Sequence, residues 1–555
     1  MAVSLEVPFL VVGAGPVGLT AAHLLAAAGR RCLVVERREG PQRHPAAHVV
    51  NARTLEILRQ AGVDMDAVDA VAKDPADAGH VNFVSRLDGQ LIGRLPFERQ
   101  GADCLDLTPT PLRNISQHVL EPILGATLGT RAGADLRYRT VWESSEQDPD
   151  GVTSRLRDLD TGEVIEVRSR ALLAADGAGS GIRKAAGIEM VGPTALQSFV
   201  AIHVLADLRS IVADRLGVLH FVMDPAVSGV FIAHDLDREW VFMVGFDPDV
   251  ESVDDYDRAR CEGIVRAAIG VAGESVPLDV VGVDTWHMSA QVAERMRDRR
   301  VFLVGDAAHR FPPTGGLGLN TGVADVHDLV WKLGAVDDGW APSAILDTYE
   351  SERRPVAVAN CEQSTTNAFK IVTLLDALGI AATPTTEALD EALADPSRRA
   401  AIDAAVADQA THFDMIGLQL GYCYADGALA RGSEDVPAPG HPSRLDPHAA
   451  VGARLPHAWT DDGRSTLDLV DPRVLTLVSF GAHDTWATEG RRVGAPLQHL
   501  RIGLDVQVAD HWRRRCRLGA EGALLVRPDQ HVAWRGDGAD AAGALATAVD
   551  TVLCR

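Results

Sequence analysis

The sequence predicts an α/β fold that is divided among several domains. Three observations lead to this prediction: a strand–helix–strand pattern opens the chain, residues 187–295 hold a succession of short β-rich runs, and strands alternate with helices again over 465–555. A chain of 555 residues is also too long for one ordinary hydrophobic core, so we expect about two to four domains.

Composition and charge exclude several classes of protein. The net charge of −24 would repel the phosphates of a nucleic acid, so we expect no such partner. No apolar run reaches the roughly 18 residues that a membrane span needs, and the apolar N-terminus has the character of a strand, not of a leader. The seven cysteines form no CxxC pair, which predicts neither disulfides nor a metal site. We therefore expect a cytoplasmic protein with reduced thiols.

The opening segment "FLVVGAGPVGLTAAHLLAAAGRRCLVVER" (9–37) predicts the first strand and helix. Gly13, Gly15 and Gly18 have the G-x-G-x-x-G spacing that joins a strand to a helix. The first glycine permits a tight turn, the second lets a pyrophosphate approach the backbone, and the third lets helix and strand pack closely. The helix N-terminus then offers free N–H groups to the phosphates. Glu36 ends the next strand, where an acid binds an adenosine ribose, which favours FAD or NAD over NADP.

Two later segments place acidic residues at predicted strand ends. "ALLAADGAGSGIRKAAG" (171–187) puts Asp176 after an apolar strand. "RVFLVGDAAHRFPPTGGLGLNTGVADVHDLVWKL" (300–333) puts Asp306 there, followed by a glycine-rich loop and a helix that begins near Asn320. An acid at the carboxyl end of a strand can bind a sugar hydroxyl, and a loop before a helix N-terminus can support a ring edge that becomes negatively charged.

With these three motifs in this order, the whole chain resembles the single-component FAD-dependent aromatic hydroxylases, the class A flavoprotein monooxygenases. It is most similar to the branch of phenol 2-monooxygenase and 2,4-dichlorophenol 6-monooxygenase. Four further segments carry that resemblance: "RHPAAHVVNARTLEILRQAGV" (43–63), "NISQHVLEPIL" (114–124), "GLQLGYCYADGAL" (417–429) and "VGARLPHAW" (451–459).

The resemblance implies a Rossmann-like FAD-binding domain with an inserted β-sheet substrate domain, followed by a thioredoxin-like C-terminal domain. The expected boundaries are 1–186 and 296–400 for the FAD-binding domain, with 76–104 as a candidate part of the substrate domain, then 187–295 for the substrate domain, 401–450 for a helix and extended linker, and 451–555 for the C-terminal domain. Cys516 stands alone in that last domain, so we expect it to serve stability or oligomerisation and not redox chemistry.

The resemblance also implies which residues hold FAD. The first three glycines would bind its pyrophosphate, Asp306 its ribityl or phosphate region, and Leu319 and Asn320 would offer backbone N–H groups to the pyrimidine oxygen. The complete expected set is Gly13, Gly15, Pro16, Val17, Gly18, Glu36, Arg37, Gln117, Asp176, Gly177, Asp306, Gly316, Gly318, Leu319 and Asn320.

The expected reaction is hydroxylation of a small phenolic or related aromatic substrate with NAD(P)H and O₂, through a flavin C4a-hydroperoxide and ortho to an existing hydroxyl. A phenolate is far more electron-rich than a phenol, and a phenol ionises only near pH 10, so the site needs a group that takes the proton. The sequence does not choose between NADPH and NADH. We also expect a homo-oligomer.

His48 is the candidate base, because the resemblance aligns it with an aspartate that activates phenol, and an imidazole suits proton transfer near neutral pH. Pro313 would lie where dioxygen adds to the flavin. The candidate substrate-lining residues are His48, His220, Met223, Phe231 and Pro313.

One departure from the family pattern concerns the cofactor contacts. Ala46 stands where related sequences carry an arginine, so Arg43 or Arg53 is a candidate replacement. His309 is expected to have a structural role.

Two other interpretations remain open. The same flavin chemistry could hydroxylate, epoxidise or insert oxygen into a larger polyketide-like or heteroaromatic metabolite. A protein of another class, a non-catalytic binding protein with the FAD fold, is disfavoured because all three cofactor motifs are present. A flavin-dependent halogenase is disfavoured because no W-x-W-x-x-I-P segment occurs.

Overall fold

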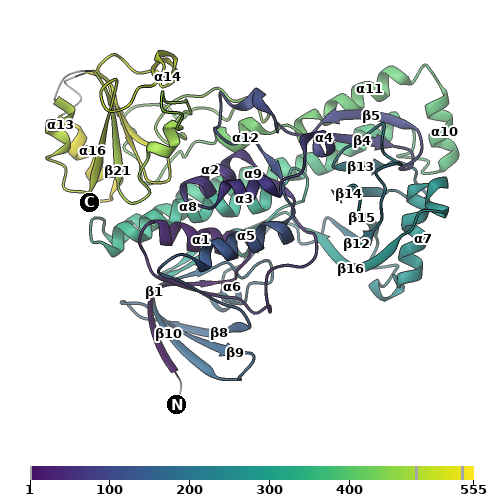
Figure 1. Cartoon of the computed structure of the whole chain (residues 1–555), viewed down its shortest axis with the longest axis horizontal. Coiled ribbons are helices and arrows are strands. Elements are labelled where there is room, and N and C mark those ends of the chain that lie inside the picture. Colours follow the sequence, from purple (N-terminus) through teal and green to yellow (C-terminus); the bar gives the residue numbers. More distant parts are fainter. Residues whose placement is uncertain (1–2, 482–484, 539–542) are drawn as a thin grey trace.

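Five parallel strands form the sheet that carries the N-terminal motifs (Figure 1). In this computed structural model, which describes residues 3–481, 485–538 and 543–555, their order is β19–β10–β1–β2–β7. The apolar runs 9–12 and 32–35 are buried, as parallel strands covered by helices must be. The strands are β1 (Val3–Val12), β2 (Cys32–Val35), β7 (Ala134–Arg137), β10 (Val164–Ala174) and β19 (Val301–Leu303), with β18 (Arg297–Asp298), β8 (Thr140–Gln147) and β9 (Val152–Asp158) antiparallel beside them.

Helices from distant parts of the chain cover this sheet. Helix α1 follows β1 directly and packs against both α5 and the long α8, and α8 packs in turn against α9. Their bounds are α1 (Pro16–Ala27), α2 (Ala52–Gln60), α3 (Met65–Ala70), α4 (Pro75–Ala78), α5 (Gln117–Gly129), α6 (Gly181–Ala185), α8 (Leu317–Asp337) and α9 (Thr348–Ala377). Within the described residues, none of the helices combines the length and the apolar character that crossing a bilayer requires.

A second sheet of seven strands lies to the right of the first in Figure 1. Its order is β16–β12–β15–β14–β13–β4–β5, so residues 80–96 supply two strands to a sheet whose other strands come from 197–288. The strands are β4 (His80–Val84), β5 (Leu91–Pro96), β12 (Gln197–Leu205), β13 (Leu219–Val222), β14 (Gly229–Asp235), β15 (Glu239–Phe246) and β16 (Asp279–Met288).

The two faces of the seven-stranded sheet belong to different hydrophobic cores. One face packs on α7 (Arg258–Ile269) through side chains such as Trp240 and Phe242. The other face packs on the end of α9, on α10 (Thr386–Ala394) and on α11 (Arg399–Asp408) through Phe83, Leu378 and their neighbours. Because side chains alternate along a strand, the register decides which residues can face a ligand.

The C-terminal domain is a sheet of order β22–β21–β23–β24, in which β21 and β22 are parallel and the other pairs antiparallel. With α13 between the parallel strands and α16 after the final hairpin, this is the βαβ–ββα topology of the thioredoxin fold. The elements are β21 (Leu475–Phe480), α13 (Thr485–Gly490), β22 (Leu497–Ile502), α14 (Asp510–Arg515), β23 (Ala523–Val526), β24 (Val532–Gly536) and α16 (Leu545–Val552). Burial raises the pKa of the Cys516 thiol to about 12, so this thiol is unreactive.

Short elements connect these units. The segment between α12 (Ile416–Gly421) and β21 is mostly irregular. Its one helical element is a short 3₁₀ turn, Thr466–Leu469. Two small sheets lie at the junction of the large ones and are made of β3 (Val49–Val50), β6 (Arg113–Asn114), β11 (Met190–Val191), β17 (Gln291–Ala293) and β20 (His309–Arg310).

Candidate cofactor and substrate site

The three sequence motifs meet at the carboxyl ends of three adjacent parallel strands, β1, β10 and β19. A Cβ placed on Gly13 would lie 2.1 Å from the carbonyl oxygen of Ala175, and one placed on Gly305 would lie 3.1 Å from Val17 Cγ2. The segments that carry Gly15, Asp176 and Asp306 therefore share one edge of the sheet. This edge is where open α/β sheets bind their ligands.

The glycines of the first motif differ in what confines them. Gly13 has a φ of +107°, and a Cβ on Gly18 would lie 2.0 Å from the Gly13 oxygen, so the packing of the chain itself requires both. Gly15 has only Glu121 Oε1 near its Cβ position, at 3.9 Å, and nothing lies within 4 Å at Gly177. The open space beside Gly15 fits a ligand that approaches the backbone at the start of α1.

Two helices begin at this edge without a side-chain cap. Gly15 is the N-cap of α1, and Gly316 is the N-cap of α8 with a φ of +61°. The first N–H groups of a helix have no partner inside the helix, so these termini offer donors to an anion. The donors of α1, which begins with Pro16 and Val17, suit a pyrophosphate, and those of α8 include the N–H group of Leu319.

Glu36 is held as an anion at the end of β2. Its carboxylate accepts the backbone N–H groups of Ala14 and Arg38, each at 2.9 Å. Burial opposes ionisation, but the hydrogen bonds of Arg38 and Ala14 lower the pKa of Glu36 below its ordinary value. The Arg38 guanidinium also reaches both oxygens, with Nε 3.2 Å from Oε1 and Nη2 3.4 Å from Oε2. Arg37 next to it is exposed.

The residues that support Glu36 were not predicted from the sequence. Arg38 also reaches Glu121, which is fully buried, at 3.2 Å, and Glu121 accepts from Gln117 Nε2 and from the backbone N–H of Gln42, both at 2.7 Å. Gln117 therefore lies at this edge as a partner of Glu121. The run "VERREG" points to charge beside Glu36 but gives no sign of its partner on α5.

The two aspartates of the later motifs have different surroundings. Asp306 is exposed, and desolvation of its carboxyl by the surrounding protein raises its pKa. Asp176 accepts from Ser180 Oγ at 2.6 Å and from the N–H of Ile182, and burial raises its pKa as well. A carboxyl of this kind gains from hydrogen-bond donors such as sugar hydroxyls. Asp306 has the free oxygens for that contact.

A chain of side chains fixes the tautomer of His48. Gln100 Nε2 donates to the carbonyl oxygens of Ala78 (3.1 Å) and Phe97 (2.8 Å), which settles which end of its amide is nitrogen. Gln100 Oε1 therefore accepts from Asn114 Nδ2 at 3.0 Å, and Asn114 Oδ1 accepts from His48 Nδ1 at 3.1 Å. The proton of neutral His48 is thus assigned to Nδ1, and Nε2 is left as an acceptor.

A buried cation acts on this histidine. Burial and, second, the positive charge of Lys73 lower the pKa of His48 to about 3. Burial lowers the pKa of Lys73 itself to about 7, against the attraction of Glu239 and Asp235. His48 is therefore neutral at physiological pH. Lys73, which a pKa of about 7 leaves only partly protonated there, favours negative charge nearby in its protonated form. Nothing in the local sequence around Lys73 indicates this position.

An aromatic cluster begins at the His48 ring. The ring stacks on Phe97 with centroids 6.3 Å apart, and Phe97 and Phe221 each lie close to Phe413, at 6.2 and 6.1 Å. Met223 belongs to the same hydrophobic cluster. The acceptor of His48 is thus placed beside an apolar, aromatic wall.

The structure corrects the expectation for His220 and Phe231. These two residues pair across β13 and β14 and point to the face of the sheet that packs on α7, where the His220 ring lies 5.8 Å from Trp240. His234, three positions after Phe231 on β14, points instead toward His48, with ring centroids 5.8 Å apart. The expectation was wrong because alternation identifies two faces without saying which of them packs on α7 and which lies toward His48.

The glycine-rich loop before α8 is confined by the protein itself. A Cβ on Gly315 would lie 2.5 Å from Met415 Cε, and one on Gly316 would lie 2.6 Å from Val49 Cβ. Asn320 fastens the start of α8 to the His48 segment, because its side chain accepts the N–H of Asn51 at 2.9 Å and donates to the Val49 oxygen at 3.0 Å. Pro313 in this loop is exposed. The loop therefore keeps a fixed position next to His48.

A cluster of buried ion pairs contacts the segment that leads into this loop. Asp325 accepts from the N–H of Gly305 (3.2 Å) and from His309 Nε2 (2.7 Å), and its other oxygen pairs with Arg353 Nε at 2.9 Å. His309 is fully buried in this contact, in keeping with the structural role expected for it. Arg353 donates on to the hydroxyl of Tyr424 at 3.2 Å.

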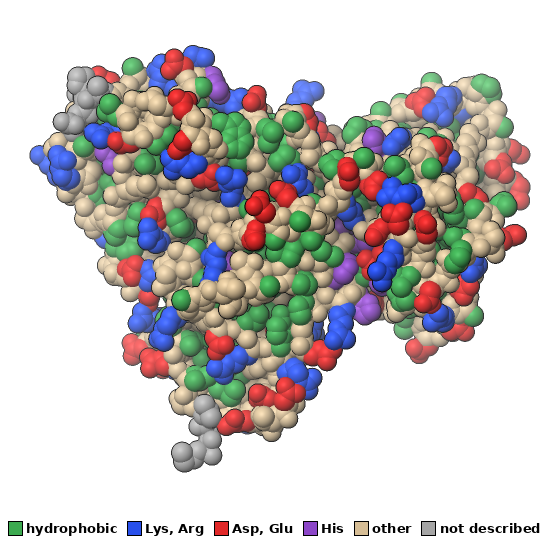
Figure 2. Space-filling view, in the orientation of Figure 1, with side chains coloured by type: hydrophobic (Ala, Val, Ile, Leu, Met, Phe, Trp, Pro, Cys, Tyr) green, Lys and Arg blue, Asp and Glu red, His purple; other side chains and the backbone are tan. Residues whose placement is uncertain are grey.

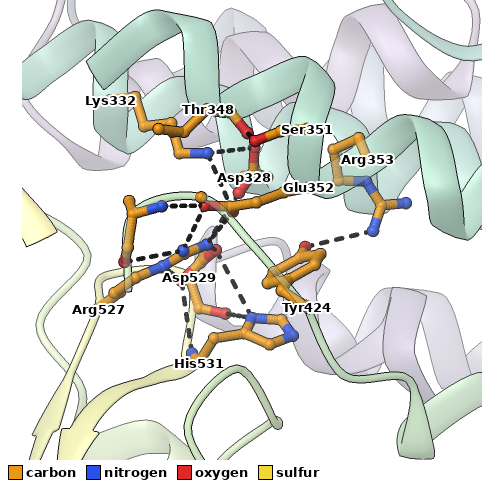
Figure 3. A network of polar contacts seen from close by, with 12 residues as sticks. Asp328, Lys332, Thr348, Ser351, Glu352, Arg353, Tyr424, Arg527, Asp529 and His531 are labelled. Carbon is orange, nitrogen blue, oxygen red and sulfur yellow. Dashed lines mark hydrogen bonds and ion pairs between the residues drawn. The ribbon is translucent and has the colours of Figure 1, made fainter. Parts of the chain in front are cut away.

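Figure 3 shows how the C-terminal domain joins this cluster. Arg527 reaches from the end of β23 to Glu352 Oε2 (2.7 Å) and Asp328 Oδ1 (2.9 Å), and it also pairs with Asp529. Lys332 pairs with Asp328 at 2.8 Å and with Glu352 at 3.0 Å. Asp328, Glu352 and Asp529 are the one group in the described part of the chain whose spacing would suit a metal ion, but their oxygens already face these two cations.

Neither candidate replacement for the missing arginine at position 46 is free at this edge. Arg53 is buried and bonds Glu56, Gln530 Oε1 (2.6 Å) and the carbonyl oxygen of Asp529. It therefore ties α2 to the C-terminal domain. Arg43 is exposed and pairs with Glu39.

Comparisons with known proteins give a consistent result. Residues 6–364 match the family model described as "FAD binding domain", and residues 448–555 match "Aromatic-ring hydroxylase, C-terminal". The chain is 36% identical to a tetracenomycin B2 monooxygenase-dioxygenase of Streptomyces olivaceus, with 96% of both chains covered. It is 33% identical to a 2,4-dichlorophenol 6-monooxygenase of Cupriavidus pinatubonensis, covering 100% of this chain and 98% of the other. The crystal structure of the flavin-dependent monooxygenase PieE with FAD and substrate superposes with a TM-score of 0.92 at 33% identity, over 100% of both chains.

Proposed function

Because the chain belongs to the FAD-dependent aromatic-ring hydroxylases, we propose that it uses NAD(P)H and O₂ to hydroxylate a phenolic substrate, with His48 as the base. The observation that carries the proposal is the locked tautomer of His48, whose Nε2 is an acceptor beside an aromatic wall. The glycine-rich loop that holds Pro313 lies next to the same segment. We place hydroxylation ortho to the existing hydroxyl, as the family resemblance implies.

The residues of the sheet edge fit FAD. Gly15 and the start of α1 would hold its pyrophosphate, Glu36 a ribose hydroxyl, Asp306 the ribityl or phosphate region, and the N–H groups of Leu319 and Asn320 the pyrimidine edge of its ring. When bound and reduced by NAD(P)H, FAD supplies the activated oxygen that the aromatic ring receives.

His48 and Lys73 would divide the task of ionising the substrate. A phenol ionises near pH 10, so a neutral imidazole with a pKa of about 3 is by itself a weak acceptor for that proton. The positive charge of Lys73 favours the phenolate, and the phenolate in turn raises the proton affinity of His48. The pair can therefore generate an electron-rich ring.

We propose two candidate classes of substrate, which differ in size. A single-ring phenol is the first, as in the chlorophenol relative. A larger fused aromatic is the second, favoured by the higher identity to the tetracenomycin B2 enzyme. A panel that includes both classes, with product mass measured for the gain of one oxygen, separates them. We also propose a homo-oligomer, which light scattering of the purified protein tests.

The test of the function compares wild type with His48→Ala. We expect yellow protein in both, and NADPH or NADH oxidation stimulated by phenols in the wild type. In the variant, hydroxylation should fall by about 10²–10⁴-fold while the flavin absorbance persists, because only the base is lost. His287→Ala, which alters an exposed histidine on β16, is the matched control.

Two results would contradict the proposal. Colourless protein, or oxidation that no aromatic stimulates, would favour the non-catalytic binding protein. Unchanged turnover of His48→Ala from about pH 6 to pH 9 would remove His48 from the mechanism while leaving the flavin chemistry in place.

A further inference from the structure

Histidines gather where the seven-stranded sheet meets the rest of the molecule. Rings lie in succession from the interior outward: His48 to His234 at 5.8 Å and His234 to His118 at 6.3 Å between centroids. His118 Nε2 lies 3.3 Å from the Glu239 carboxylate, and His203 Nε2 lies 3.1 Å from its other oxygen. Figure 2 shows histidine side chains on the wall of the hollow between the two lobes. The succession thus starts at the proposed base and ends at a partly exposed carboxylate.

His48 cannot pass a proton onward through its own ring. Its Nδ1 already donates to Asn114, and an amide oxygen does not take over that proton. A proton accepted at Nε2 must therefore leave from Nε2. The neighbouring ring that could receive it is that of His234.

His234 is hydrogen-bonded to a hydroxyl that can carry a proton onward. Its Nδ1 shares a hydrogen bond of 2.5 Å with the hydroxyl of Ser116, which begins the turn that carries His118 on α5. A hydroxyl both donates and accepts, so it can carry a proton between two groups. The gaps between successive rings exceed direct hydrogen-bond contact and are of the width that one water bridges. Nδ1 of His118, the nitrogen that does not face Glu239, is buried without a partner in the described residues.

The charges around His234 keep it in the form that such a path needs. Burial first, then Lys73, His48, His118 and His203, hold the pKa of His234 well below its ordinary value. A neutral imidazole has one donor and one acceptor, whereas an imidazolium has no acceptor. Asp235 and Glu239 are the acidic groups that face Lys73 from β14 and β15. The pKa of Glu239 is lowered to about 2 by His118 and His203, so it remains a carboxylate.

We propose that His234 is a second proton-carrying residue of this site, which receives the substrate proton from His48 and passes it through Ser116 and His118 to Glu239 and the solvent. This inference rests on the proposed function. In the step, the phenol O–H bond breaks and an N–H bond forms at His48 Nε2. One proton then leaves at Glu239 as the phenolate remains, and no electrons are transferred.

The experiment measures proton release when oxidised, FAD-loaded protein binds a phenol in a weakly buffered solution with a pH indicator, in a stopped-flow instrument. The probe is a nitrophenol, whose phenolate is coloured, so ionisation and proton release are followed together. His234→Asn keeps a polar group near Nδ1 for Ser116 but cannot relay a proton. We expect its rate of proton release to fall about 10²-fold, the lower end of acid–base effects, with unchanged flavin absorbance and equilibrium nitrophenol affinity.

His118→Leu and His203→Leu form a matched pair, because each removes one ring that bonds Glu239, but only His118 lies beside His234. We expect slow proton release in the first variant and wild-type release in the second. Wild-type rates in both His234→Asn and His118→Leu would overturn the path and leave the proposed function intact. No proton release from the wild type with any phenol would overturn the proposed function and the path together.

Discussion

Two buried polar clusters of this molecule differ in how completely their atoms are paired. The ion-pair cluster, behind the glycine-rich loop, consists of Asp325, Asp328, Lys332, Glu352, Arg353, Arg527 and Asp529. The histidine cluster, beside the aromatic wall, consists of His48, His118, His203, His234, Lys73 and Glu239. In the first, opposite charges face one another at hydrogen-bond distance. In the second, the Nδ1 atoms of His118 and His203 are buried and have no partner among the residues that the structure describes.

The two clusters therefore suit different tasks. Paired charges fix one structure, whereas ring nitrogens without partners can take part in proton transfer. Fully paired charges in a dry interior specify one arrangement, because any displacement leaves a charge uncompensated. Imidazole rings with spare nitrogens specify less, and a neutral ring can accept one proton and give up another. The first cluster connects the C-terminal domain to Gly305 through Arg353 and Asp325. The C-terminal domain thereby contributes to the position of the candidate flavin loop, which a stability role alone did not suggest.

The largest expected effect concerns the ion-pair cluster. Arg527→Met leaves Asp328 and Glu352 with Lys332 as their remaining cation, in a region with no exposure to solvent. We expect the free energy of unfolding to fall by about 3–5 kcal/mol, the cost of breaking a buried ion pair from one side. Urea unfolding, followed by circular dichroism, measures it.

The control for that variant is Arg514→Met, on the exposed side of α14 in the same domain. It should change stability by less than about 0.5 kcal/mol, as surface substitutions usually do. If the free energy of unfolding of Arg527→Met also fell by less than about 1 kcal/mol, the ion-pair cluster would not hold the domains in one arrangement. The contrast with the histidine cluster would then be wrong.

The part of this organisation that follows from sequence is the part made of local patterns. Gly13, Gly15 and Gly18, with Asp306 later, mark strand ends, because turn geometry and helix termini have their own residue requirements. The topology then brings those ends together, since adjacent parallel strands end at the same edge.

Residues that depend on long-range pairing could not be predicted. Lys73 acquires its role from β14 and β15, more than 150 positions away, and Glu121 from Arg38 on another element. The orientation of His220 and Phe231 depended on which face of the sheet α7 covers. Arg53 sits in a segment that resembles a cofactor motif, yet its partners lie in the C-terminal domain.

A smaller effect is expected from Lys73→Met. Loss of a positive charge disfavours an anion nearby, so the pH at which a bound nitrophenol ionises should rise, by about 1 unit for a charge a few ångströms away. The pKa of His48 should rise as well, because Lys73 lowers it, although burial is the larger cause. An absorbance titration of the nitrophenol bound to oxidised protein measures the shift.

Lys184→Met is the matched control for this charge, since Lys184 is exposed on α6. The control should leave the titration unchanged. A wild-type titration in Lys73→Met would show that this side chain does not face the substrate. Another group would then have to stabilise the bound phenolate.

The smallest expected effect is also the sharpest test of the contrast. His203→Leu removes a ring whose Nδ1 is buried with no partner in the described part of the chain and whose Nε2 shares Glu239 with His118. Loss of one hydrogen bond is offset by removal of an unsatisfied polar atom, so we expect the free energy of unfolding to change by less than about 1 kcal/mol. Urea unfolding beside Arg527→Met makes the comparison direct. A loss of 3 kcal/mol or more, as estimated for a broken buried ion pair, would mean that the histidine cluster is as firmly structural as the ion pairs. Rings held that tightly could not reorganise to pass a proton from His48 toward Glu239.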